Sequence, residues 1–218
     1  MSVVDYDRRG SIGVLRLNAP PVNAIAFALL DDLRHALRRA NADAQVRGLV
    51  ITGDTRHFSA GADVNLFREI TGAADAMRTS RVFQEAFQEV EDSGKPVAAA
   101  VAGHVTGGAL ELAMACHFRV CASESRFSAP EVKLGINPGA GGTQRLPRLI
   151  GAGPALKMLL TGDAISADEA LAAGLVDAVC EGKDLVEKAT GLLESHLLVR
   201  TRDRVEKARN GMENDAAF

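Results

Sequence analysis

One glutamate stands where a carboxylate is costly to bury. Glu111 lies in an apolar helical run, Leu110 to Cys116, directly after the paired glycines Gly107 and Gly108. A buried carboxylate loses its hydration unless protein groups compensate for it. Free backbone N–H groups at a helix start suit a developing negative charge. The stretch therefore combines a carboxylate with a backbone that can bind an anion.

A second carboxylate, Glu131, follows Pro130 twenty residues later. Both glutamates also fit roles without chemistry. With Gly108 as the N-cap, Glu111 takes the third position of an ordinary helix. Ser128 and Glu131 match the S-x-x-E capping box, with a proline in the first turn. The residues alone leave these alternatives open.

Three sequence blocks change this interpretation. FSAGADV at 58–64, GGALELAMA at 107–115 and SAPEVKLGINPGAGGTQRLPRLIG at 128–151 resemble, in this order, the signature blocks of the enoyl-CoA hydratase/isomerase (crotonase) family. With PPVNAIAFALL at 20–30 and LTGDAISADEALAAGLVD at 160–177, the resemblance covers nearly all of residues 10–180. Within the family, the sequence is most similar to the N-terminal hydratase/isomerase region of multifunctional beta-oxidation enzymes.

The resemblance implies a reaction and the residues that perform it. The backbone N–H groups of Ala62 and Gly108 would form an oxyanion hole for a thioester oxygen. Glu111 would help to activate a water molecule, while Glu131 would position the same water and protonate carbon. Because both carboxylates are present, we expect an enoyl-CoA hydratase that acts on 2-enoyl-CoA. The alternatives are a delta isomerase that uses mainly Glu131 and a non-catalytic acyl-CoA-binding domain of a larger multifunctional protein.

Coenzyme A would enter as part of the substrate. By resemblance, the backbone near Ala24, Ala60 and Asp63, with Gly107 in the glycine turn, is expected to bind it. Position 65 is Asn, where many relatives have a lysine, so the residues that meet the phosphates stay unassigned. The five histidines show no metal spacing. We expect neither a metal nor a separate cofactor.

Composition excludes several other classes of protein. The chain of 218 residues is 47% hydrophobic, which is typical of one globular domain. Its net charge of −3 gives no basic field for nucleic acid or an anionic membrane. No stretch reaches the length of a membrane span. The three cysteines lack C-x-x-C spacing and predict buried thiols in a reducing compartment, here the cytoplasm.

Short buried strands and amphipathic helices alternate along the first half of the chain. We predict strands at 11–18, 48–53 and 95–102 and helices at 26–40 and 82–92. Three short helices follow at 141–151, 154–162 and 166–174, the last with Ser166 as N-cap; a strand at 175–180 comes next, and a helical pattern continues to about residue 198. The fold class is therefore α/β. The pattern alone favours a doubly wound sheet, whereas the family resemblance implies a crotonase-type spiral of repeated ββα units.

The helical pattern ends near residue 198, and a charged stretch follows it. We expect a catalytic domain at residues 1–198 and a charged C-terminal tail or linker at 199–218. Single-function hydratases of the family usually carry a longer C-terminal helical segment. The chain is thus expected to be a short relative or the front domain of a larger multifunctional enzyme. Unless it is such a domain, we expect a homotrimer or a hexamer.

Overall fold

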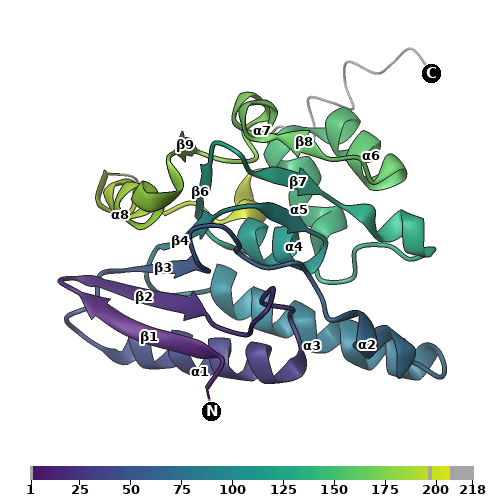
Figure 1. Ribbon diagram of the computed structural model, residues 1–218, viewed down its shortest axis with the longest axis horizontal. Helices are drawn as coiled ribbons and strands as arrows, with labels where there is room; N and C mark the ends of the chain where they lie inside the picture. Colours follow the sequence, from purple (N-terminus) through teal and green to yellow (C-terminus); the bar gives the residue numbers. More distant parts are fainter. Residues whose placement is uncertain (1, 196–197, 207–218) are drawn as a thin grey trace.

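The computed structural model describes residues 2–195 and 198–206, and its strands form two sheets (Figure 1). The larger sheet has the order β1-β2-β3-β4-β6-β9, and the smaller one has the order β5-β7-β8. In the larger sheet only β1 and β2 pair antiparallel. Its strands are β1 (Val4–Arg9), β2 (Ile12–Leu17), β3 (Gly48–Thr52), β4 (Val97–Val101), β6 (Phe118–Ala122) and β9 (Ala178–Cys180). The smaller sheet contains β5 (His104–Thr106), β7 (Arg126–Ser128) and β8 (Ile165–Ser166).

Successive turns of the chain lie on top of one another. β4 and β5 lead into α4 (Gly108–Ala115), and β6 and β7 lead into the 3-10 helix η1 (Pro130–Leu134). β4 pairs parallel with β6, and β5 pairs parallel with β7. Each turn therefore adds one strand to each sheet, which confirms the predicted spiral of ββα units.

The doubly wound sheet favoured by the sequence pattern is wrong, and a tight turn after β4 is the reason. Gly103 has φ +71°, and a side chain there would collide with the carbonyl oxygen of Arg56. This glycine turns the chain directly into the second sheet instead of into a crossover helix. A buried strand has the same continuous apolar sequence in both folds, so the periodicity of the sequence could not distinguish the two folds.

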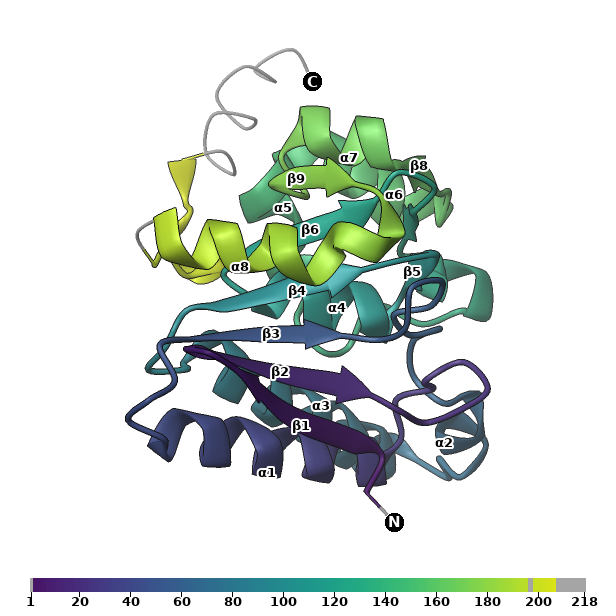
Figure 2. The same ribbon diagram turned by 60° about the vertical axis from the view of Figure 1, so that its left-hand side comes forward.

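Helices cover both faces of the larger sheet. α1 (Phe27–Ala42), α3 (Ala73–Glu91) and α4 share one hydrophobic cluster with the sheet. Figure 2 shows α8 (Leu185–Ser195) in front of the opposite face, where it packs on β3, β4 and β6. Neighbouring residues of β3 alternate between the two layers, since Leu49 and Ile51 face the first and Val50 faces α8. Strands enclosed in this way need the continuous apolar runs seen in the sequence.

The second half of the chain forms the predicted short helices. They are α5 (Gly142–Ile150), α6 (Ala152–Thr161) and α7 (Ala167–Ala173), and Ser166 caps α7 in a capping box with Glu169. Several elements differ from the expectation, among them β1, β5, β6, β7 and β8, which were not predicted. The short helix α2 (Val64–Arg68) was not predicted, and α3 begins at Ala73 rather than at residue 82. The first half of α3 carries few buried apolar residues, so the helical period is weak there.

The end of the described chain packs on the domain. After η2 (Gly182–Asp184) and α8, the 3-10 helix η3 (Thr201–Asp203) places the buried Thr201 beneath α4. The Thr201 hydroxyl donates a hydrogen bond to the carbonyl oxygen of Met114 at 2.9 Å. The boundary at residue 198 stays a prediction, and residues 207–218 lie outside the described residues.

Candidate active site

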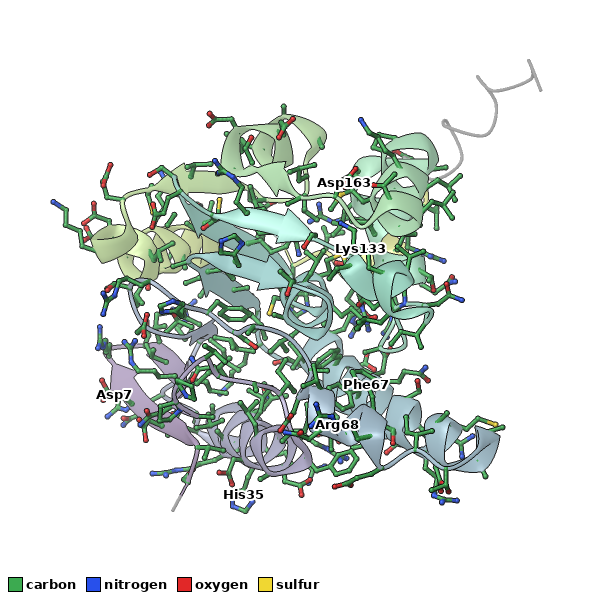
Figure 3. The ribbon with its side chains drawn as sticks, turned by 45° about the vertical axis from the view of Figure 1, so that its right-hand side comes forward. Asp7, His35, Phe67, Arg68, Lys133 and Asp163 are labelled. Atoms are coloured by element: carbon green, nitrogen blue, oxygen red, sulfur yellow. The ribbon has the colours of Figure 1, made fainter. Side chains whose placement is uncertain are left out.

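A cavity of about 230 Å³ contains both predicted carboxylates. Glu111 and Glu131 line it together with Ala62 and Gly108, so the structure brings these four predicted residues to one place. Apolar side chains from α2, the loop after it, α3 and the loop after η1 also line the cavity, namely Leu66, Phe67, Ile70, Ala76, Phe83 and Ile136. Figure 3 shows Phe67 on α2 beside Arg68. The site is thus a largely apolar cavity that contains two carboxyl groups.

Two backbone N–H groups meet at the same end. The Ile25 N–H donates to the Gly61 carbonyl at 2.8 Å, and the Asp63 N–H donates to the Ile25 carbonyl at 3.0 Å. This parallel bridge directs the Ala62 N–H away from Ile25, toward the start of α4. A methyl group on Gly108 would lie 3.1 Å from the Ala62 nitrogen. Gly108 is the first residue of α4, so its N–H has no acceptor within the helix.

Glu111 is held by a glycine-rich loop. The residue is 5% exposed, and its Oε1 accepts hydrogen bonds from the backbone N–H groups of Ala140 at 2.8 Å and Gly142 at 2.7 Å. Burial raises the pKa of Glu111 to about 7, although the Gly142 and Ala140 N–H groups oppose the rise. The N-cap of α4 is Gly107, and the Glu111 carboxylate binds another loop. The assignment of Glu111 to the third position of the helix is therefore wrong.

Glu131 presents an unpaired oxygen. It is 9% exposed, and its Oε2 has no hydrogen-bond partner among the described residues. The N-cap of η1 is Ala129, and no side chain caps that helix, so the capping-box alternative is wrong as well. A methyl group on Gly107 would lie 3.1 Å from Oε1, which places this carboxyl against the glycine turn. Burial raises the pKa of Glu131.

The end of α6 positions the segment that carries Glu131. Gly162, with φ +64°, ends α6 so close to η1 that a methyl group there would lie 3.0 Å from the Cα of Pro130. Lys133 of η1 and Asp163 form an ion pair at 3.6 Å, and both are labelled in Figure 3. The pair is exposed and contributes little stability. The close backbone packing at Gly162 therefore fixes η1.

The residues expected to meet coenzyme A lie beside the predicted oxyanion hole. The Ala60 N–H donates to the Val22 carbonyl at 2.9 Å, and Ala24 precedes the bridge to Ala62. The Asp63 side chain accepts from the Asn65 N–H at 2.9 Å and so caps α2. The structure brings Ala24, Ala60 and Asp63 together through backbone pairing. Their contact with coenzyme A stays a prediction.

The sequence and the fold both have close counterparts. A model of the family described as "Enoyl-CoA hydratase/isomerase" matches residues 7–217. The chain belongs to this family. The crotonyl-CoA hydratase of Syntrophomonas wolfei is 40% identical over 96% of this chain and 82% of its own length. The peroxisomal bifunctional enzyme of Pongo abelii is 43% identical over 86% of this chain, which spans only 25% of that protein. The enoyl-CoA hydratase of Bacillus anthracis has 36% identity and a TM-score of 0.82, covering 88% of this chain and 75% of its own.

Sequence reasoning missed the loop that binds Glu111. Gly139, Ala140 and Gly142 lie in the third sequence block, but no role was predicted for them. In this member of the hydratase/isomerase family, the small residues bring the loop backbone within reach of Glu111, since a methyl on Gly142 would lie 3.0 Å from Oε1. The Gln84 side chain also donates to the Gly139 carbonyl at 2.7 Å. The run of glycines was the signal that could have found this support.

The predictions about metal and membrane stay predictions. Among residues 2–195 and 198–206, no three His, Cys, Asp or Glu side chains gather so as to hold a metal ion. In the same part of the chain, no helix has the length and apolar character to cross a bilayer. Of the three cysteines, Cys116 and Cys121 are buried and Cys180 is half-buried.

Proposed function

We propose that the protein is an enoyl-CoA hydratase, which adds water across the 2,3 double bond of 2-enoyl-CoA thioesters in fatty-acid beta-oxidation. The product is a 3-hydroxyacyl-CoA. One observation carries the proposal: Glu111 and Glu131 open on one apolar cavity, beside the N–H groups of Ala62 and Gly108. Relatives that are named hydratases support it.

The two N–H groups would hold the thioester oxygen. Attack of water at the β-carbon moves negative charge onto this oxygen, and the enolate is the species that needs stabilisation. Donors fixed in advance by the fold suit this charge, and each is typically worth about 3–4 kcal/mol. The positive end of α4, which begins at Gly108, adds to the same stabilisation.

The two carboxylates would divide the proton transfers. The hydroxyl of the water joins C3, and a proton joins C2, so the net reaction consumes one water and no cofactor. Oε1 of Glu111 is held by Ala140 and Gly142, which leaves Oε2 for the water. Oε2 of Glu131 is likewise without a protein partner in the described chain. Burial raises both pKa values, that of Glu111 to about 7, and a group with a pKa near the operating pH suits proton transfer.

The rest of the cavity suits the acyl chain. Its wall of α2 and α3 side chains is apolar, and hydrocarbon bound there would be removed from water. The backbone of Ala24, Ala60 and Asp63 lies just outside the oxyanion hole, where it would meet the coenzyme A portion of the substrate. Acyl-CoA is therefore the proposed binding partner.

Hydration is tested by following the ultraviolet absorbance of the conjugated enoyl thioester after addition of the protein to crotonyl-CoA. We expect kcat to fall about 10²–10⁴-fold in Glu111→Gln and in Glu131→Gln. The exchange Glu124→Gln at an exposed position is the matched control and should keep the wild-type rate. Wild-type turnover in Glu131→Gln would overturn the proposal.

The same variants separate the alternative functions. A delta isomerase that uses mainly Glu131 would keep its rate on a 3-enoyl-CoA in Glu111→Gln. A non-catalytic domain would bind crotonyl-CoA without changing its absorbance in any variant. The presence of both carboxylates in one cavity favours hydration over these two.

We further propose a homotrimer or hexamer in the cytoplasm. Exposed leucines on η1 and α6 support self-association.

The proposed location rests on the three cysteines, which form no disulfide and so support a reducing compartment. Cell fractionation tests the location, and recovery of the protein with a membrane-bound organelle would contradict it.

A further inference from the structure

A buried ion pair lies behind the loop that binds Glu111. Glu91, near the end of α3, is 1% exposed, and Arg145 of α5 is 7% exposed. Arg145 donates to Oε2 of Glu91 from Nε at 3.2 Å and from Nη2 at 2.9 Å. The two residues are 54 positions apart, so the pair joins α3 to α5. Neither residue lines the catalytic cavity.

The third nitrogen of Arg145 reaches the loop itself. Nη1 donates to the Ala140 carbonyl at 3.0 Å, and the N–H of the same Ala140 donates to Glu111. The guanidinium lies against Gly141, where a methyl group would collide with Nη1. Gly141 has φ +109°, a conformation that only glycine adopts readily. A continuous chain of contacts thus runs from Glu91 through Arg145 and Ala140 to Glu111.

Stability alone is a weak reason for this arrangement. A buried ion pair loses the hydration of two charges, and well-packed apolar residues often serve a fold as well or better. The loop around Ala140 consists of small residues, which offer little side-chain surface to hold it in one conformation. A planar guanidinium with several donors can fix such a backbone.

We propose that Arg145, oriented by Glu91, is a positioning residue for Glu111. It fixes the Ala140 carbonyl, so that the two loop N–H groups hold Oε1 of Glu111 and leave its other oxygen directed at the substrate water. This inference rests on the proposed function, in which Glu111 acts on that water. A displacement of about 1 Å at a reacting group can reduce the rate about 100-fold.

The C-terminal segment completes the support of Glu91. The Arg202 N–H donates to Oε1 of Glu91 at 2.8 Å, so the carboxylate receives three hydrogen bonds. His117 holds the backbone of the same residue, with Nε2 at 3.2 Å from the Glu91 carbonyl oxygen. Nδ1 of His117 accepts from the Val97 N–H, so Nε2 carries the proton and donates. Glu91 is therefore held by the segments that carry Arg202 and His117 as well as by Arg145.

The test separates positioning from folding with two variants. Arg145→Met leaves the Glu91 charge without its partner, so it should lower both kcat and the midpoint of thermal unfolding. In the double variant Glu91→Gln/Arg145→Met, neither charge of the pair is left, and Gln keeps an acceptor for the Arg202 N–H. We expect the double variant to regain the wild-type midpoint, while kcat on crotonyl-CoA stays about 10–100-fold low and KM changes less than about threefold.

Arg148→Met is the matched control. Arg148 lies on the same helix and donates to the Gln144 carbonyl at its surface, so this variant should keep the wild-type kcat. Recovery of kcat along with stability in the double variant would overturn the inference, as would equal losses in Arg145→Met and Arg148→Met. A fully active Glu111→Gln would instead overturn the proposed function, whatever the arginine variants do.

Discussion

At Glu111 the fold holds a carboxylate where its charge is disfavoured. Burial raises the pKa of this group to about 7, against an ordinary value of 4.5. The folded protein therefore binds a proton more tightly than the unfolded chain, and its stability rises as the pH falls from about 7 to about 4.5. Above pH 7 the ionised group lowers the free energy of unfolding by roughly 3 kcal/mol at most. The role proposed for Glu111 thus carries a cost in stability above pH 7.

Glu111→Gln is predicted to remove this cost. Gln keeps an oxygen for the Ala140 and Gly142 N–H groups but carries no charge at any pH. At pH 8 the variant should be more stable than the wild type, by up to about 3 kcal/mol. The difference should disappear near pH 4.5, as measured by urea unfolding across this range. A difference that does not change with pH would contradict the prediction, and Glu124→Gln controls for the exchange itself.

Gly108→Ala is predicted to impair the oxyanion hole without harming the fold. The added methyl would lie 3.1 Å from the Ala62 nitrogen, between the two donors that must meet the thioester oxygen. We expect kcat on crotonyl-CoA to fall about 10²–10³-fold, as on loss of one donor. Gly153→Ala, in the first turn of α6 with open space around it, is the matched control and should be fully active. Equal rates in the two variants would exclude the hole at this position.

At the scale of elements, α2 and α3 form a thin wall beside the cavity. Leu66, Ile70 and Thr79 line both the catalytic cavity and a second, outer one of about 340 Å³ that also contains Phe27 and Val82. The exposed helix α2 spans only five residues. Leu66 of α2, Ile70 of the following loop and Thr79 of α3, rather than a deep core, therefore separate the two spaces.

Ile70→Ala is predicted to join the two spaces and to favour longer acyl chains. The ratio of kcat/KM for 2-octenoyl-CoA to that for crotonyl-CoA should rise about tenfold, within the range of what a few methylenes contribute in an apolar pocket. Ile136→Ala is the matched control, because Ile136 lines the inner cavity alone. A similar rise in both variants would show that added volume, and not the outer cavity, sets the preference.

Elements that are buried on both faces were the easiest to predict from the sequence. The strand predicted at 48–53 is β3 at Gly48–Thr52, since an enclosed strand must be apolar throughout. The two carboxylates were predicted from the motif resemblance. The residues that surround and hold them were not predicted. Arg145 supports Glu111 through a carbonyl oxygen from a residue five positions away, a contact that leaves no side-chain pattern. The start of α3 was missed because its inner face lines a cavity instead of a packed core.

At the scale of the whole molecule, one face leaves large apolar side chains in water. Leu134 of η1 and Leu156 and Leu160 of α6 are 64%, 54% and 69% exposed. Leu156 and Leu160 are four positions apart, so they lie on one side of α6, and α6 packs against η1. Exposed apolar side chains on neighbouring elements are typical of a protein interface. It is a sensible place to test the proposed homotrimer or hexamer.

Leu160→Glu is predicted to break this assembly. Light scattering after gel filtration should give three or six chain masses for the wild type and one for the variant, because a charge in an apolar interface loses its hydration without a partner. Met77→Glu is the matched control, since Met77 is as exposed but lies on α3, away from α6 (Figure 1). A wild-type monomer would contradict self-association. Dissociation by Met77→Glu alone would place the interface on α3, and the acyl wall formed by α2 and α3 would then depend on a neighbouring subunit.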